Sequence, residues 1–137
     1  MKIVSACLAG INCAYDGQSR SCEKVIEMVR NHEAIPVCPE QLGGLTTPRI
    51  PAEIQKGRVI NQTGEDVTEY FNRGAREALR IAKLVNCKEA ILKTHSPSCG
   101  FGNIYDGTFS HTKIKGNGIF AEMLVKEGIE VMTEKEV

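Results

Sequence analysis

The sequence has no excess of charge of either sign, no long apolar run and no low-complexity segment. Its 17 Lys and Arg residues are matched by 17 Asp and Glu residues, and the two signs are interspersed along the chain. Nonspecific binding to DNA or RNA depends on neutralising phosphates with Lys and Arg, so this balance argues against a general nucleic-acid binder. A small uncharged or anionic ligand fits the composition better.

No apolar stretch approaches the roughly 20 residues that a helix needs to cross a bilayer. The first residues also lack the basic n-region and the long apolar h-region of a secretory signal peptide. We therefore expect a cytoplasmic protein. Its six cysteines are expected to be thiols, metal ligands or catalysts, because disulfide frameworks belong to oxidising compartments.

Short apolar runs alternate with helical patterns and long loops. At 137 residues the chain can bury a core without disulfides or metal, so we expect one domain spanning residues 1–137. Expected strands lie at 2–6, 34–37, 89–93 and 129–132, a short hairpin spans 54–60, and helices begin after Ser21, cover 67–85 and follow Gly118. This alternation predicts an α/β fold with three layers, in which a mostly parallel, Rossmann-like sheet of about four strands carries helices on both faces.

Three cysteines, Cys7, Cys38 and Cys99, follow expected strands. Because the carboxyl ends of parallel strands share one edge, these thiols are expected to meet there, where such sheets bind ligands. They can be small buried apolar groups, or they can be three thiolates of a metal site. A structural zinc needs a fourth ligand, for which His95 is the candidate, whereas an iron–sulfur cluster held by three thiolates keeps one iron open.

Polar residues beside these cysteines are candidates for chemistry. Glu40 lies two residues after Cys38 in a Pro-containing turn, where a carboxylate can shuttle protons. Ser96, ahead of Pro97, can orient a water or a substrate carbonyl. Arg49, between prolines, either contacts an acidic group or braces its loop. Cys13 is read as a spare or regulatory thiol.

Several motifs carry a resemblance to a known family: S-A-C-L-A-G at 5–10, C-P-E-Q-L-G-G-L-T-T-P-R at 38–49, K-T-H-S-P-S-C-G at 93–100, and Y-D-G at 15–17 and 105–107. In this order and spacing, the sequence resembles the thiouracil desulfidase family over nearly its whole length. The resemblance implies that Cys7, Cys38 and Cys99 bind a [4Fe-4S] cluster with one open iron. It also implies that Glu40 and Ser96 take part in catalysis.

The implied reaction is the non-redox removal of sulfur from a thiolated pyrimidine such as thiouracil, which releases uracil and hydrosulfide. The resemblance implies that the open iron binds the substrate sulfur, that Glu40 handles the proton of an attacking water, and that Ser96 positions the reactants. A free thiolated base or nucleoside is the expected partner, because the chain has no basic surplus for RNA. The alternatives are a zinc-dependent, deaminase-like hydrolase in which Glu40 activates water, a non-catalytic iron–sulfur sensor, and a purely structural domain.

Overall fold

A four-stranded parallel sheet forms the centre of the protein, which a computed structural model describes over residues 1–137. The strand order is β2-β1-β5-β8. The bounds are Lys2–Ser5 for β1, Ala34–Val37 for β2, Glu89–Leu92 for β5 and Glu130–Thr133 for β8. Ile3 and Val4 of β1 are fully buried on opposite faces. The middle of β1 is therefore apolar on both faces, as expected of a parallel sheet covered on both sides.

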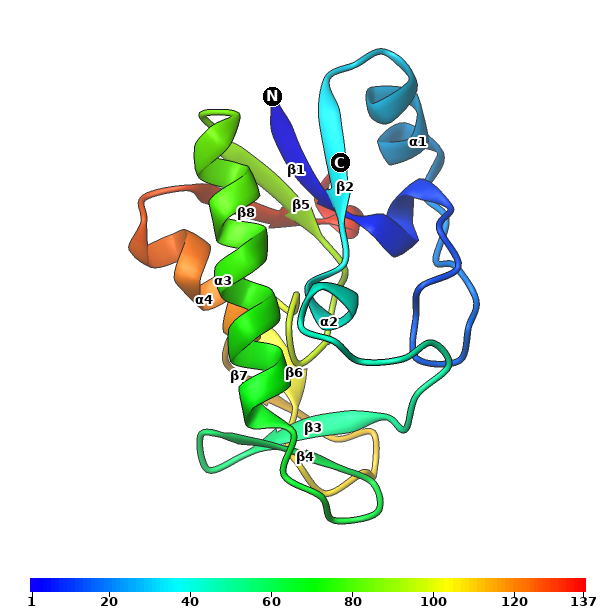
Figure 1. Cartoon of the computed structure of the whole chain (residues 1–137), viewed down its shortest axis with the longest axis vertical. Coiled ribbons are helices and arrows are strands. Elements are labelled where there is room, and N and C mark those ends of the chain that lie inside the picture. Colours follow the sequence, from blue (N-terminus) through cyan, green and yellow to red (C-terminus); the bar gives the residue numbers. More distant parts are fainter.

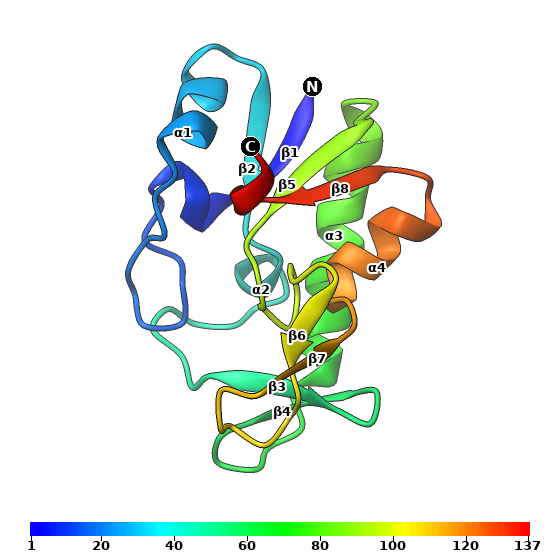
Figure 2. The ribbon, with the colours of Figure 1, turned by 180° about the vertical axis from the view of Figure 1, so that it is seen from behind.

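Helices cover both faces of this sheet. Helix α1 (Glu23–Arg30) and the 3₁₀ turn η1 (Ala6–Ala9) pack on one face, and α3 (Thr68–Leu84) and α4 (Ile119–Lys126) pack on the other (Figures 1 and 2). The predicted three-layer α/β fold is thus confirmed. None of the helices is both long and apolar enough to cross a lipid bilayer.

The first crossover runs from β1 to β2 over one face, and the second runs from β2 back past β1 to β5 over the other face. Strand order therefore reverses between β1 and β5. Loops that leave the carboxyl ends of these two strands diverge, and they leave a crevice between them. Pro36 is accepted in β2 because this strand lies at the edge of the sheet, where its missing N–H is not needed.

A short helix, α2 (Pro39–Leu42), follows β2 and crosses α3 at a pair of glycines. A Cβ added to Gly43 would lie 2.0 Å from the carbonyl oxygen of Tyr70, and one added to Gly74 would lie 1.7 Å from that of Pro39. The two backbones touch at this crossing. The contact fixes the start of α2, and with it the residues that follow β2.

Two antiparallel hairpins lie beyond the carboxyl edge of the sheet (Figure 2). One pairs β3 (Ala52–Gln55) with β4 (Arg58–Asn61), and the other pairs β6 (Asn103–Tyr105) with β7 (Lys113–Lys115). Glu53 Oε1 joins them, because it accepts hydrogen bonds from the backbone N–H groups of Gly107 and Phe109 at 3.0 and 3.1 Å. The hairpins thus form the far wall of the crevice. The chain ends in a 3₁₀ turn, η2 (Glu134–Glu136).

Helix starts differ from the sequence expectation. Ser21 is not the N-cap of α1, because the helix begins one residue later with Cys22 in the capping position. Asp66 with Glu69 three residues later predicts a capping box at the start of α3. That prediction is also wrong: Val67 is the N-cap, while Asp66 Oδ1 accepts a hydrogen bond from the N–H of Thr68 at 3.0 Å. Asp66 still satisfies a free N–H of the first turn, but from one residue further out.

We predict that Gly74→Ala destabilises the protein, although alanine normally favours a helix interior by about 1 kcal/mol over glycine. The added methyl would press into the carbonyl of Pro39, so the free energy of unfolding should fall by about 1–3 kcal/mol. Urea unfolding measures the change. Arg76→Ala, at an exposed position of the same helix, is the matched control and should change stability little. A stabilised Gly74→Ala protein would contradict the contact.

Candidate functional site

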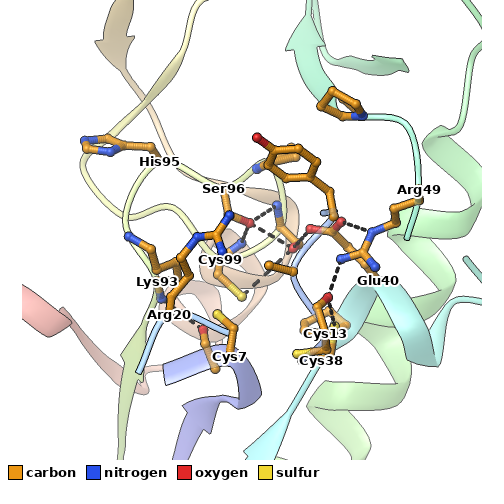
Figure 3. Close-up of a pocket in the computed structure, with 18 of the residues that line it drawn as sticks. Cys7, Cys13, Arg20, Cys38, Glu40, Arg49, Lys93, His95, Ser96 and Cys99 are labelled. Atoms are coloured by element: carbon orange, nitrogen blue, oxygen red, sulfur yellow. Dashed lines mark hydrogen bonds and ion pairs between the residues drawn. The ribbon is translucent and has the colours of Figure 1, made fainter. Parts of the chain in front are cut away.

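Cys7, Cys38 and Cys99 are brought together at the carboxyl edge of the sheet, as the sequence predicts. Cys7 lies in η1 directly after β1, Cys38 is the N-cap of α2 directly after β2, and Cys99 lies in the loop that follows β5. All three line one cavity of about 450 Å³. Figure 3 shows their side chains on the same wall, below Ser96 and Glu40.

Burial disfavours the thiolate forms of Cys7 and Cys99. It raises the pKa of Cys7 to about 11, helped by the charge of Cys38. The pKa of Cys99 is likewise raised, chiefly because the side chain is removed from water. Cys38 differs: a hydrogen bond from Cys13, helped by the backbone of Gln41, lowers its pKa to about 7. Holding all three as thiolates would require positive charge nearby, which a metal centre can supply.

The geometry of the thiols decides between two kinds of metal centre. No three His, Cys, Asp or Glu side chains converge closely enough to hold one metal ion. Thiolates on a single zinc lie about 3.8 Å apart, because Zn–S bonds are about 2.3 Å long and tetrahedral. Thiolates on a cluster stand farther apart, because each binds a different iron. The thiols as they stand therefore do not form the single-ion zinc site that the sequence left open, whereas three thiols that line one cavity without converging on a point are compatible with a cluster.

Glu40 faces the same cavity and is held from two sides. Its Oε1 accepts a hydrogen bond from Nε of Arg49 at 2.8 Å, and its Oε2 accepts one from the hydroxyl of Ser98 at 2.8 Å. The two side chains of the ion pair are only 14% and 7% exposed. Arg49 also donates to the carbonyl of Cys13 and the hydroxyl of Thr47, so it both pairs with an acid and braces its loop. A pair this deeply buried fixes the carboxylate in one position.

Ser96 lines the cavity close to this carboxylate (Figure 3). Its Oγ accepts hydrogen bonds from the N–H groups of Ser98 and Cys99 at 3.1 and 2.9 Å. Loop serines commonly form such turns, and here the turn also ties Ser96 to a candidate cluster ligand. The sequence does not point to Ser98, which lies between Ser96 and Glu40. The S-P-S spacing at 96–98 is the one local signal, and the partner on Glu40 lies 58 residues away.

Of the three remaining cysteines, one lines the cavity and two lie outside it. Cys13 is buried in the cavity wall beside Cys38, whose Sγ lies 3.9 Å from the Cys13 carbonyl oxygen. Cys22 caps α1, and Cys87 donates to the carbonyl of Glu89 at 3.1 Å ahead of β5. Neither Cys22 nor Cys87 lines the cavity.

His95 does not act as a fourth ligand in this geometry. Its ring points away from the cysteines (Figure 3) and lies 5.6 Å from the ring of Tyr105. Burial lowers the pKa of His95, and the charges of Lys113 and nearby lysines lower it further. The ring lines the cavity, together with Tyr105 and Phe109 of the β6–β7 hairpin and Tyr15 of the first loop.

Comparisons with known proteins agree with this geometry. Residues 3–136 match the family model described as 2-thiouracil desulfurase. The chain is 44% identical to the uncharacterized protein YbbK of Bacillus subtilis (strain 168) over 147 aligned positions, which cover all of this chain and 97% of the relative. Its structure superposes with a TM-score of 0.94 on the [4Fe-4S]-dependent thiouracil desulfidase TudS. That match has 42% sequence identity and covers 98% of this chain and 91% of the other.

The likeness to both proteins extends over almost the whole chain. It therefore includes the central sheet, the loops that leave its carboxyl edge and the hairpins opposite. On the strength of this full-length match, the chain belongs to the 2-thiouracil desulfurase family.

Proposed function

We infer that the protein is a [4Fe-4S]-dependent enzyme that removes sulfur from thiouracil and releases uracil and hydrosulfide. The observation that carries this function is the arrangement of Cys7, Cys38 and Cys99 on one cavity wall, with the fixed carboxylate of Glu40 beside them. The family to which the chain belongs and the solved desulfidase that it resembles support the same activity.

Cys7, Cys38 and Cys99 would hold the cluster, one from each of three loops at the edge of the sheet. A [4Fe-4S] cluster on three thiolates supplies an iron without a protein ligand, which is a soft Lewis acid suited to a thiocarbonyl sulfur. Cys13 is not needed for this set.

Glu40 and Ser96 act on the other reactant, which is water. The reaction replaces the C=S bond with a C=O bond, so water supplies the oxygen, one of its protons leaves on sulfur as hydrosulfide, the other is released to solvent, and no electron is gained or lost. Each oxygen of the Glu40 carboxylate receives one hydrogen bond from the protein, so acceptor sites remain for a further proton. Glu40 is the base that receives the proton of the attacking water, and Ser96 orients the reactants.

The substrate that fits is a free thiolated base or its nucleoside. A cavity of about 450 Å³ lies within the roughly 300–1,000 Å³ usual for small-molecule sites. The aromatic side chains that line it, Tyr15, Tyr105 and Phe109, offer flat apolar surfaces to a pyrimidine ring. Arg49 cannot serve the substrate as a free charge, because Glu40 and backbone carbonyls already occupy it.

We predict that the chain, loaded with iron and sulfide under anaerobic conditions, converts 2- or 4-thiouracil to uracil. Uracil and hydrosulfide should appear in equal amounts without an added oxidant or reductant, because the reaction is a hydrolysis. Chromatography measures uracil, and a colorimetric assay measures sulfide. The same chain without iron is the control and should be inactive. A fully loaded protein that turns over no thiolated pyrimidine would instead support the sensor reading.

Glu40→Gln should lower kcat for thiouracil by about 10²–10⁴-fold, because the amide cannot take a proton from water. Cluster absorbance should survive, since the three thiols are untouched. Glu69→Gln, an exposed position at the start of α3, is the control and should keep full activity. Circular dichroism checks that the variant is folded, because the buried Arg49 guanidinium loses its charged partner. Full activity in Glu40→Gln would rule out its role as base.

A further inference from the structure

Three polar side chains stand in a row at the cavity wall. The Oγ atoms of Ser96 and Ser98 lie 3.1 Å apart, and the Oγ of Ser98 lies 2.8 Å from Oε2 of Glu40. Ser96 itself is not bonded to Glu40, so the middle hydroxyl is the connection between the two residues that the proposed function uses.

The direction of these hydrogen bonds follows from the number of protons available. A carboxylate can only accept, so the single hydroxyl proton of Ser98 is donated to Glu40. The Ser96 oxygen already accepts from the N–H groups of Ser98 and Cys99. Its own proton therefore points to the Ser98 oxygen. Cys99 Sγ is a weaker competitor for the Ser98 proton, because it lies 3.9 Å away.

Ser98 cannot easily turn away from this arrangement. It is 1% exposed, and its carbonyl accepts hydrogen bonds from the N–H groups of Phe120 and Ala121 at the start of α4, at 2.9 and 3.1 Å. A Cβ added to Gly118 would lie 2.5 Å from the carbonyl carbon of Ser98, so the backbone is enclosed as well. The start of α4 therefore sets the direction of the Ser98 side chain.

We propose that Ser98 relays a proton from Ser96 to Glu40, so that Ser96 acts on the attacking water and not only as a positioning group; this inference rests on the proposed function. As the oxygen of water bonds to the thiocarbonyl carbon, its proton passes to Ser96 Oγ. The Ser96 proton passes to Ser98 Oγ, and the Ser98 proton passes to Oε2 of Glu40. When the C–S bond breaks, the same path returns this proton to the leaving sulfur, which departs as hydrosulfide, and the second water proton is released from the new carbonyl oxygen to solvent, so atoms and electrons balance.

The two backbone N–H groups on Ser96 make this direction of transfer favourable. Donors at 2.9 and 3.1 Å stabilise the negative charge that develops on Ser96 Oγ when its proton leaves ahead of the incoming one. Fixed backbone donors play this part in oxyanion holes. Glu40, paired with Arg49, is the end of the path.

Kinetics of the iron-loaded full-length protein test the relay. Ser98→Ala should lower kcat for thiouracil by about 10²-fold with little change in KM and in cluster absorbance, and Ser98→Thr, which keeps the hydroxyl, should recover most of the loss. Ser21→Ala, an exposed serine outside the cavity, is the control. A Ser98→Ala enzyme as active as the parent overturns the relay. Activity lost together with the cluster shows a structural role and overturns it too.

A double-mutant cycle separates a relay from two independent groups. If Ser96 and Ser98 form one path, the Ser96→Ala/Ser98→Ala protein should lose no more activity than the worse single variant. Losses that multiply would overturn the relay. A loaded parent that is inactive on thiouracil removes the proposed function and the relay with it, and this outcome is distinct from an active parent with an unaffected Ser98→Ala.

A second readout does not depend on activity. In the full-length chain labelled with ¹³C at glutamate carboxyls and kept free of iron, the Glu40 resonance is identified by its absence in Glu40→Gln. Ser98→Ala should shift that resonance, because it removes the hydrogen bond to Oε2, whereas Ser21→Ala should leave it in place. An unshifted Glu40 resonance in Ser98→Ala would show that the middle link does not exist, and would overturn the relay.

Discussion

The parallel pairing of β1 with strands on both its sides is the constraint on which the site depends. Ile3 of β1 lies opposite Ile35 of β2 and opposite Ala90 of β5. This register sets where each strand ends, and hence where Cys7 and Cys38 stand relative to each other. If β2 or β5 shifted its pairing with β1 by one residue, the cysteine that follows it would move along the edge of the sheet. The side chains of that strand would also exchange faces. The apolar core on both faces of the sheet therefore holds the register that the proposed cluster site requires.

Two buried contacts position the candidate catalytic residue Glu40 relative to the sheet. The crossing of α2 and α3 at Gly43 and Gly74 places the first turn of α2, which contains Glu40. The ion pair of Glu40 with Arg49 then ties that turn to the loop ahead of β3. Because the carboxylate is shared between a structural ion pair and the proposed chemistry, the same residue serves stability and catalysis.

Much of the fold follows from the sequence pattern. The strand at 34–37 and the hairpin around residues 54–60 are confirmed, and so is the amphipathic helix α3, whose buried face repeats at helical spacing. The 3₁₀ turn η1 and helix α2 escape pattern analysis, because four residues are too few for periodicity. Pro39 also reads as a breaker, although proline is well accepted in the first turn of a helix.

The candidate site is predictable only in part, because sequence patterns reveal local features and not contacts between distant residues. Cys7, Cys38 and Glu40 lie next to strand ends, so local patterns find them. The membership in the family is confirmed by the family model, and the predicted desulfidase activity and iron–sulfur cofactor agree with that family and with the solved desulfidase, while the individual roles of Glu40 and Ser96 stay predictions. The link through Ser98 depends on tertiary structure, since its hydroxyl meets a carboxylate 58 residues away. No local spacing encodes that contact.

The most direct test of the central claim is the iron and acid-labile sulfide content of anaerobically reconstituted protein. The parent should carry about four iron and four sulfide per chain, as a [4Fe-4S] site requires. Cys7→Ala, Cys38→Ala and Cys99→Ala should each lose them, whereas Cys22→Ala and Cys87→Ala, which lie outside the cavity, should keep them. A parent that binds only zinc without sulfide, or equal loss in all five variants, would contradict the claim that three strand ends assemble the cluster site.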